Sequence, residues 1–285
     1  MSAMNIAEPG QFPEGGKVRL LRRRAKPRVS LRQRMRAEKL RKGVFLIPSL
    51  FTAGNLMCGF FSVIATFNGD FVYAAALIML ANILDGIDGY AARLTKTTSR
   101  FGVEFDSLAD VVSFGVAPAV LVYIWALEPW RTWGWLAACT YVTCGALRLS
   151  RFNVQAQSGA KSYFVGLPIP AAAQMITSTV IMYYYLGGAG AANRHVIFLL
   201  VIYGLAALMV SNIPYFSLKN NDFKKRHPIW MLVSGIVLIT LFIAEWHYMF
   251  FIVVLLYTLS GPLLWCFTTQ KRRREKRQEA AKATP

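Results

Sequence analysis

The chain has 285 residues, of which 55% are hydrophobic and only 16% are charged, and its formal net charge is +18. A soluble domain carries about 25% charged residues, so this composition excludes an ordinary soluble globular protein. The apolar residues come in long blocks separated by short polar segments, which is typical of a polytopic membrane protein. We therefore expect an all-α fold, a bundle of transmembrane helices.

The first 44 residues are polar and strongly basic, with thirteen Lys and Arg residues between Lys17 and Lys42. They contain no short apolar core, so they do not resemble a cleavable signal peptide. We expect residues 1–44 to form a cytoplasmic tail that is partly disordered, and we expect the same of the basic residues 269–285 at the other end. Both tails either only set the topology or also bind anionic lipid headgroups.

Residues 45–268 form the predicted membrane domain, with eight apolar blocks. The candidate spans are 45–66, 71–92, 107–127, 133–150, 168–186, 195–213, 229–244 and 249–268. Thirty of the 32 Lys and Arg residues lie in the two tails and in alternate loops between these spans. Because basic segments stay on the cytoplasmic side, both termini are predicted to be cytoplasmic. The same asymmetry explains the positive charge without a nucleic-acid partner.

Four carboxylates stand out around the junction of the second and third spans. Asp85 and Asp88 are three residues apart and Asp106 and Asp110 are four apart, so each pair projects from one face of a helix. Polar residues at 94–99 predict a cytoplasmic turn, and two antiparallel helices would then bring the pairs together. A charged residue at mid-membrane costs at least about 2.5 kcal/mol, which makes these acids candidates for a functional site.

The mutual repulsion of four close carboxylates has to be relieved, either by protonation or by bound cations. Ligand sets made only of oxygen favour hard ions such as Mg²⁺ or Mn²⁺, and two such ions would suit phosphoryl transfer. Acids that pair with Arg93 and Arg100 without metal are the alternative. Gly89 and Ala92 share the helical face of the first two carboxylates, where small residues let a ligand approach the backbone or simply let helices pack.

Read together, these residues form one pattern: Asp85-x-x-Asp88-Gly89-x-x-Ala92-Arg93, eight residues, then Gly102-x-x-x-Asp106-x-x-x-Asp110. The pattern resembles the signature of the CDP-alcohol phosphatidyltransferase family at every position. The resemblance implies a bundle of membrane helices whose site opens to the cytoplasmic leaflet of the cell membrane. It also implies that the four aspartates hold two divalent ions, Mg²⁺ or Mn²⁺, and that Asp110 is the general base.

Further contacts and an assembly follow from the same resemblance. Contacts with the CDP-lipid are implied for Thr52, Asn55, Gly89, Ala92, Arg93 and Gly102. Members of the family commonly form homodimers, so the resemblance implies a homodimer embedded among membrane lipids.

Four segments are similar, more narrowly, to integral-membrane phosphatidylserine synthases: FTAGNLMCGF (51–60), SLADVVSFGVAPA (107–119), GALRLSRFN (145–153) and YFVGLPIPAAA (163–173). This likeness implies transfer of the phosphatidyl group from CDP-diacylglycerol to L-serine, with release of CMP. Arg148, Arg151 and Asn153 are candidates for binding the serine carboxylate or the lipid phosphate, or else serve only as topological and headgroup contacts. Pro168 and Pro170 either line the acceptor pocket or only start a helix.

Two alternatives remain open at the level of sequence. The same chemistry could use another alcohol, such as inositol, glycerol phosphate or choline. The acids could instead form the ion site of a cation transporter, although the spacing of Gly89, Ala92 and Arg93 then has no purpose.

Overall fold

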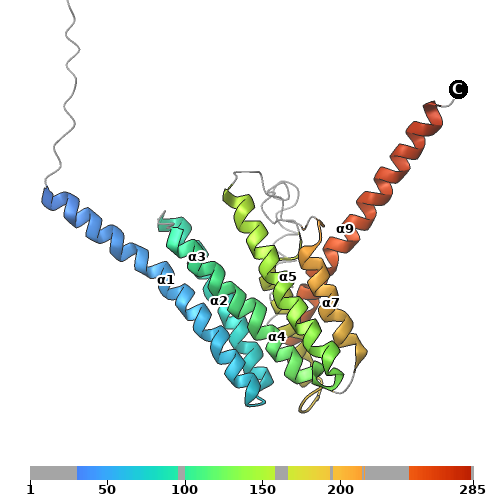
Figure 1. The fold of residues 1–285 in the computed structure, drawn as a ribbon, viewed down its shortest axis with the longest axis horizontal. Coiled ribbons are helices and arrows are strands. Elements are labelled where there is room, and N and C mark those ends of the chain that lie inside the picture. Colours follow the sequence, from blue (N-terminus) through green and yellow to red (C-terminus); the bar gives the residue numbers. More distant parts are fainter. Residues whose placement is uncertain are drawn as a thin grey trace, which may run out of the picture. The chain divides into compact units, whose positions relative to one another are not determined.

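The computed structural model describes residues 31–95, 100–157, 166–192, 195–213, 215 and 244–283. Residues 1–40 form one unit and residues 41–285 form a second unit, which contains the helix bundle (Figure 1). The elements in these described ranges are helical throughout, which confirms the all-α class. The predicted span at 229–244 lies outside the described residues, except for Ala244.

Helices lie at each of the other predicted spans. They are α1 (Leu31–Phe67), α2 (Phe71–Thr95), α3 (Arg100–Asp110), α4 (Ala117–Val122), α5 (Thr132–Gln157), α6 (Ile169–Tyr185), α7 (Val196–Val210) and α9 (Trp246–Ala283). Two π-helical segments, η1 (Val111–Val116) and η2 (Tyr123–Leu127), and a short 3-10 helix, η3 (Glu128–Trp130), extend α3 and α4 into one helical run.

Four stretches of the described chain are long and apolar enough to cross a membrane. They are Ser49–Phe67, Phe71–Ala91, Phe101–Trp130 and Trp246–Cys266. The helix α7 is also apolar but shorter. The described part of the chain therefore has the character of a multi-pass membrane protein, and the full number of spans and the orientation of the termini stay predictions.

The first and last helices of the described chain extend into the two basic tails. The helix α1 begins at Leu31, well before the predicted span, and α9 continues to Ala283. These extensions are rich in Arg, Lys, Glu, Gln and Ala, which have high intrinsic helix propensity. Residues 31–44 and 269–283 are therefore helical, whereas residues 1–30, 284 and 285 lie outside the described part of the chain, so partial disorder of the tails stays a prediction.

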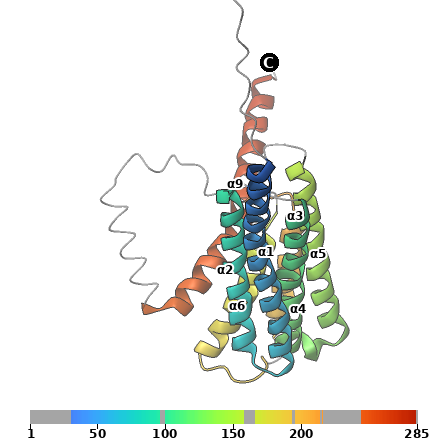
Figure 2. The ribbon, with the colours of Figure 1, turned by 90° about the vertical axis from the view of Figure 1, so that its left-hand side faces the viewer.

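The helix α6 forms the centre of the described bundle. Most of its residues are buried, and it contacts α2 and α9 as well as the η1 segment. The helix α5 packs on α7 and on η1. In both ribbon views α1, α2, α3 and α5 run alongside one another (Figure 2). This arrangement brings the ends of α2 and α3 next to α1 and α5.

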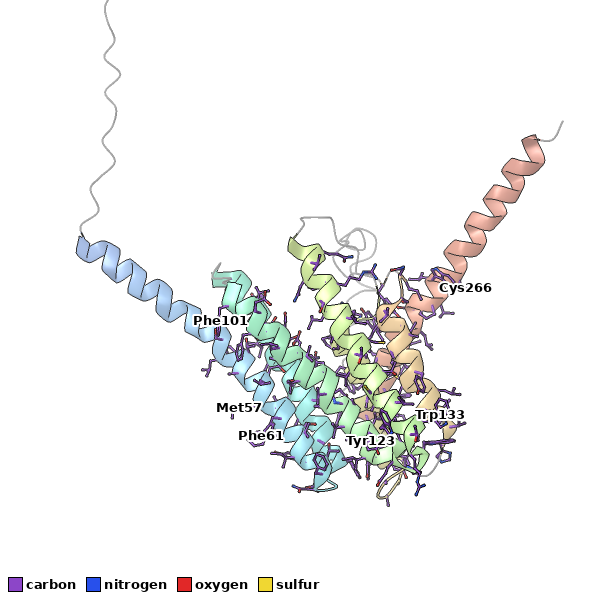
Figure 3. The ribbon with its side chains drawn as sticks, viewed as in Figure 1. Met57, Phe61, Phe101, Tyr123, Trp133 and Cys266 are labelled. Carbon is purple, nitrogen blue, oxygen red and sulfur yellow. The ribbon has the colours of Figure 1, made fainter. Side chains whose placement is uncertain are left out.

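Large apolar side chains cover the outside of the bundle (Figure 3). Met57, Phe61, Phe101 and Trp133 are 57%, 48%, 66% and 63% exposed. A soluble monomer rarely exposes so much contiguous apolar surface. Lipid tails are the environment that such a surface requires.

A proline interrupts the backbone hydrogen bonds of the long run that begins at α3. Pro118 has no N–H to donate to the carbonyl of Phe114, four residues earlier. The hydroxyl of Tyr141, from α5, donates to this carbonyl at 3.1 Å instead. Both Phe114 and Tyr141 are fully buried, so the bond satisfies a carbonyl that water cannot reach.

The same arrangement recurs in α9, around Pro262. The carbonyl of Thr258, four residues earlier, accepts a hydrogen bond from the hydroxyl of Tyr215 at 3.2 Å. Gly261 makes room for this tyrosine, because a Cβ at that position would lie 2.3 Å from the Tyr215 ring. The ring also packs against Tyr257, with centroids 5.7 Å apart. Tyr215 thereby fixes the face of α9 that carries Tyr257.

Candidate active site

Three of the four predicted carboxylates form a tight cluster. Asp85 and Asp88, near the end of α2, and Asp106, on α3, each offer an oxygen atom within 4.8 Å of the others. Asp88 is buried, and Asp85 and Asp106 are half-buried. The helix α2 ends at Thr95 and α3 begins at Arg100, so Leu94 and Thr95 of the predicted turn belong to α2, and its other residues, 96–99, lie outside the described part of the chain.

Asp110 lies beside this cluster, one helical turn beyond Asp106. It is buried, and its carboxylate interacts electrostatically with Asp85, Asp106 and Asp88. It is not one of the three acids whose oxygens gather within 4.8 Å. The structure thus brings the four acids to one site and separates them into a cluster of three and a neighbouring fourth.

Two polar side chains of α1 reach the acids. The hydroxyl of Thr52 donates to the Oδ2 atom of Asp88 at 2.9 Å. The amide Nδ2 atom of Asn55 donates to the Oδ1 atom of Asp110 at 3.4 Å. Both residues are buried, and they are three residues apart, so they project from the same face of the helix. The first contact holds a member of the cluster and the second holds the neighbouring acid.

A close approach of α1 and η1 positions Asn55. The hydroxyl of Ser113 donates to the backbone carbonyl of Asn55 at 2.9 Å. A Cβ at Gly59 would lie 2.4 Å from the Ser113 Oγ atom and 2.7 Å from its Cα atom, so only glycine fits there. Neither Gly59 nor Ser113 was predicted. Their spacing, one turn beyond Asn55 and Asp110, is the signal that could have identified them.

The cluster suits a hard divalent cation. Its ligand atoms are all carboxylate oxygens, which Mg²⁺ and Mn²⁺ prefer. The Oδ1 atom of Asp106 is buried and has no hydrogen-bond partner among the described residues. A cation would supply the partner that this oxygen lacks. Thr52 would then orient Asp88 as a metal ligand.

The remaining residues of the predicted motif lie on the same two helices. Gly89, on α2, and Gly102, on α3, are half-buried. Ala92 and Arg93 lie near the end of α2, and their side chains are outside the described part of the structure.

The three predicted acceptor residues have different surroundings. Arg148, on α5, is only 8% exposed, lies 5.4 Å from the ring centroid of Phe152 and interacts electrostatically with Asp110. Arg151 is exposed. The amide of Asn153 donates to the hydroxyl of Ser107 at 2.8 Å, which links α5 to α3. Arg148 is therefore the candidate with the most direct relation to the acids.

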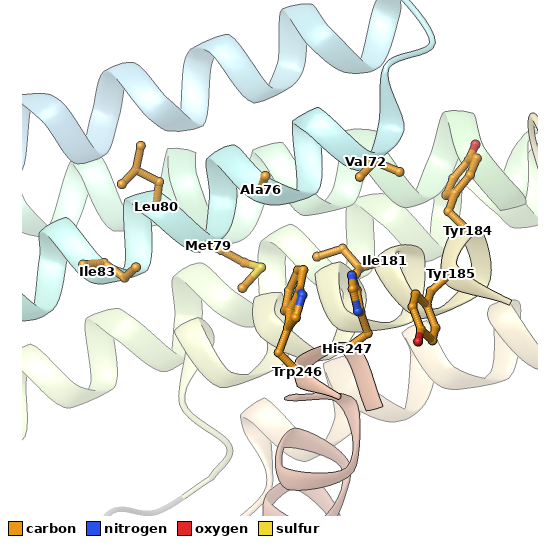
Figure 4. Close-up of a pocket in the computed structure, with 10 residues that line it drawn as sticks. All are labelled: Val72, Ala76, Met79, Leu80, Ile83, Ile181, Tyr184, Tyr185, Trp246 and His247. Atoms are coloured by element: carbon orange, nitrogen blue, oxygen red, sulfur yellow. The ribbon is translucent and has the colours of Figure 1, made fainter. Parts of the chain in front are cut away.

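An apolar groove of about 380 Å³ lies elsewhere, between α2, α6 and α9 (Figure 4). Its lining includes Val72, Met79, Ile181, Tyr185 and Trp246. None of the predicted site residues is among its described lining residues, and these include no carboxylate. Its apolar walls suit hydrocarbon rather than phosphate chemistry.

Comparison with known proteins agrees with this site. Residues 45–211 match the CDP-alcohol phosphatidyltransferase family. A CDP-diacylglycerol–serine O-phosphatidyltransferase of Helicobacter pylori is 35% identical over 228 residues, covering 80% of this chain and 94% of that protein. The enzyme of the same name from Bacillus subtilis is 43% identical over 126 residues, 44% of this chain and 70% of its own length. An archaetidylserine synthase of Methanothermobacter thermautotrophicus is 37% identical over 171 residues, 59% of this chain and 69% of its own length. The match over more than half of the chain, which includes all four aspartates, shows that this protein belongs to the CDP-alcohol phosphatidyltransferase family.

Proposed function

We propose that this protein is a CDP-diacylglycerol–serine O-phosphatidyltransferase. It transfers the phosphatidyl group of CDP-diacylglycerol to the hydroxyl of L-serine and releases phosphatidylserine and CMP. The relatives from Helicobacter and Bacillus carry this name, and the name of the archaeal relative also specifies serine. The observation that carries the proposal is the convergence of Asp85, Asp88, Asp106 and Asp110 in a chain that resembles these serine enzymes.

The acids supply the metal site of this enzyme. Asp85, Asp88 and Asp106 would hold divalent cations together with Asp110, and two ions of Mg²⁺ or Mn²⁺ fit a set of four carboxylates. Bound ions of this kind neutralise charge on the phosphates and align the attacking and leaving oxygens. The protein's own part is to keep the carboxylates converged, through the hydrogen bonds of Thr52 and Asn55.

The nucleotide end of the substrate lies between α1, α2 and α3. Residues assigned to the CDP-lipid are Thr52, Asn55, Gly89, Ala92, Arg93 and Gly102. The small residues let the nucleotide approach the helix backbone, and Arg93 offers a guanidinium that suits phosphate. The Oδ1 atom of Asn55 is buried without a partner among the described residues, so it is an acceptor that a ligand can use.

Asp110 acts as the general base. The serine hydroxyl is a poor nucleophile at neutral pH, so a base within hydrogen-bond reach has to remove its proton. Asp110 takes this proton as the serine oxygen bonds to the phosphorus atom that carries diacylglycerol. The bond from this phosphorus to the CMP oxygen breaks, and CMP leaves with the electron pair.

The acceptor binds on the side of Asp110 that faces α5. Arg148 is buried there and balances negative charge beside Asp110. Arg151 and Asn153, near the end of the same helix, are further contacts for the serine carboxylate or the lipid phosphate. The site faces the cytoplasm from the inner membrane, where serine is available, and the enzyme is a homodimer.

Release of CMP tests the proposal directly. Purified protein in CDP-diacylglycerol micelles should release CMP and form phosphatidylserine only when both L-serine and Mn²⁺ or Mg²⁺ are present. Inositol, glycerol phosphate and choline should not replace serine. The turnover rate of a folded Asp110→Asn protein should be at least about 100-fold lower than that of the wild type, which is the usual contribution of a general base. Equal rates with another alcohol would overturn the serine assignment, and a fully active Asp110→Asn protein would overturn the base.

A further inference from the structure

A second groove, of about 420 Å³, lies between α2, α6 and α9. Asn82 contributes from α2, one turn before Asp85 on the same helical face. Pro168 and Pro170 contribute from the start of α6, so these prolines both begin the helix and line a groove. The groove therefore joins the start of α6 to the helix turn that precedes the acidic cluster.

One buried donor in the lining of this groove has no hydrogen-bond partner in the part of the chain that the structure describes. Gln174 is 6% exposed, and its Nε2 atom has no hydrogen-bond partner among the described residues. The amide oxygen of the same side chain accepts from the hydroxyl of Thr177 at 3.4 Å. A buried polar group without a partner is unfavourable, so a native protein that keeps one usually has a use for it. A ligand with an acceptor oxygen would satisfy this donor.

Tyr257 connects the groove to the acids. Its side chain lines the groove together with Gln174, and it also interacts electrostatically with Arg148. Arg148 in turn interacts with Asp110. A neutral donor from α6 and a hydroxyl from α9 thus line the groove, and the Arg148 guanidinium, from α5, interacts both with Tyr257 and with the proposed base. A cation and two further donors form a suitable set for a carboxylate.

Building on the proposed transfer to serine, we infer that Gln174, Tyr257 and Arg148 bind the carboxylate of the amino-acid acceptor. Gln174 and Arg148 contact the carboxylate, and Tyr257 positions the Arg148 guanidinium. The rest of the lining is apolar and includes Ala171, Val253 and Val254, so the polar contacts act in surroundings of low polarity, where they are strong.

The first test replaces Gln174 with Leu, which has a similar size and no polar atoms. The apparent KM for L-serine should rise at least about 10-fold, because a hydrogen bond to a charged group is lost. The KM for CDP-diacylglycerol should stay the same. Thermal stability should be unchanged or higher, since the variant removes a buried donor that has no partner among the residues that the structure describes. Ser178→Ala is the matched control, a buried polar side chain one turn further along α6 that does not line the groove.

The second test uses the acceptor itself. Ethanolamine is serine without its carboxylate, and the wild-type enzyme should strongly prefer serine. Gln174→Leu and Tyr257→Phe should each reduce the ratio of kcat/KM for serine over ethanolamine, whereas Ser178→Ala should not. A merely structural role would lower both rates equally and leave the ratio unchanged.

The outcomes separate the two proposals. If the wild-type protein makes no phosphatidylserine, the proposed function fails. If it does, and both variants keep the wild-type KM for serine and the wild-type ratio, the carboxylate site is wrong. A rise only in the KM for CDP-diacylglycerol would also overturn it, because the groove would then hold the lipid.

Discussion

The four carboxylates differ in the partners that the protein provides for them. Asp88 accepts a hydrogen bond from Thr52, and Asp110 accepts one from Asn55. The Oδ1 atom of Asp106 has no partner among the described residues. This division suits a site in which some oxygens are held in place by protein donors and others are left for a cation.

Thr52 provides a test at the scale of a single residue. Thr52→Val keeps the shape of the side chain and removes the hydrogen bond to Asp88, so the carboxylate loses its orientation. The concentration of Mn²⁺ or Mg²⁺ that gives half-maximal CMP release should rise by about 10-fold or more. Thr66→Val is the control, because the hydroxyl of Thr66 bonds within α1, to the carbonyl of Ser62. Equal metal dependence of the two variants would contradict the role of Thr52.

At the scale of the element, each of two prolines in the long helices is accompanied by a tyrosine whose hydroxyl donates to the carbonyl four residues before the proline. Pro118 has no N–H to donate to the Phe114 carbonyl, four residues earlier, and the Tyr141 hydroxyl donates to this carbonyl. The π-helical segment η1 that precedes Pro118 starts directly after Asp110. Such wide turns are frequent at functional sites. The contact between Tyr141 and Phe114 therefore stabilises the helix just beyond the proposed base.

A double-mutant cycle tests this contact. Tyr141→Phe should lower the free energy of unfolding by about 1–3 kcal/mol, because a buried carbonyl loses its donor. In a Pro118→Ala background, the backbone N–H of residue 118 can bond to this carbonyl again, and Tyr141→Phe should be less damaging. The measurement is unfolding in detergent with both single variants and the double variant. Additive losses would show that Tyr141 does not act through the carbonyl of Phe114.

Sequence periodicity predicted the elements better than it predicted their contacts. The spacing of Asp85, Asp88, Asp106 and Asp110 was sufficient to expect convergence, because each pair is local on one helix and the connection is short. The roles of Tyr141, Ser113 and Gln174 could not be predicted in this way. Their partners come from distant helices, and which faces of two helices meet depends on the packing of the whole bundle.

The basic tails show a second limit of sequence analysis. A high positive charge suggested partial disorder and gave no sign that α1 and α9 extend through residues 31–44 and 269–283. Local helix propensity and continuity with a long apolar helix outweigh charge repulsion there, because starting a helix is the costly step and extending one is not.

At the scale of the whole molecule, the distribution of charge predicts the orientation. In a chain without its four native cysteines, single cysteines at Ser2 and Ala283 should react with an impermeant maleimide only in inside-out vesicles. A cysteine at the exposed Ala189, between α6 and α7, should react only in right-side-out vesicles. Labelling of positions 189 and 283 from the same side would refute the proposed topology.

The central claim is that the acids of α2 and α3 hold divalent metal where the CDP-lipid reacts. The most direct measurement is an anomalous diffraction map of the protein crystallised with Mn²⁺. The account predicts manganese peaks within about 2.0–2.6 Å of the carboxylate oxygens of Asp85, Asp88 and Asp106. Carboxylates that point apart, with no peak between them at saturating Mn²⁺, would contradict it.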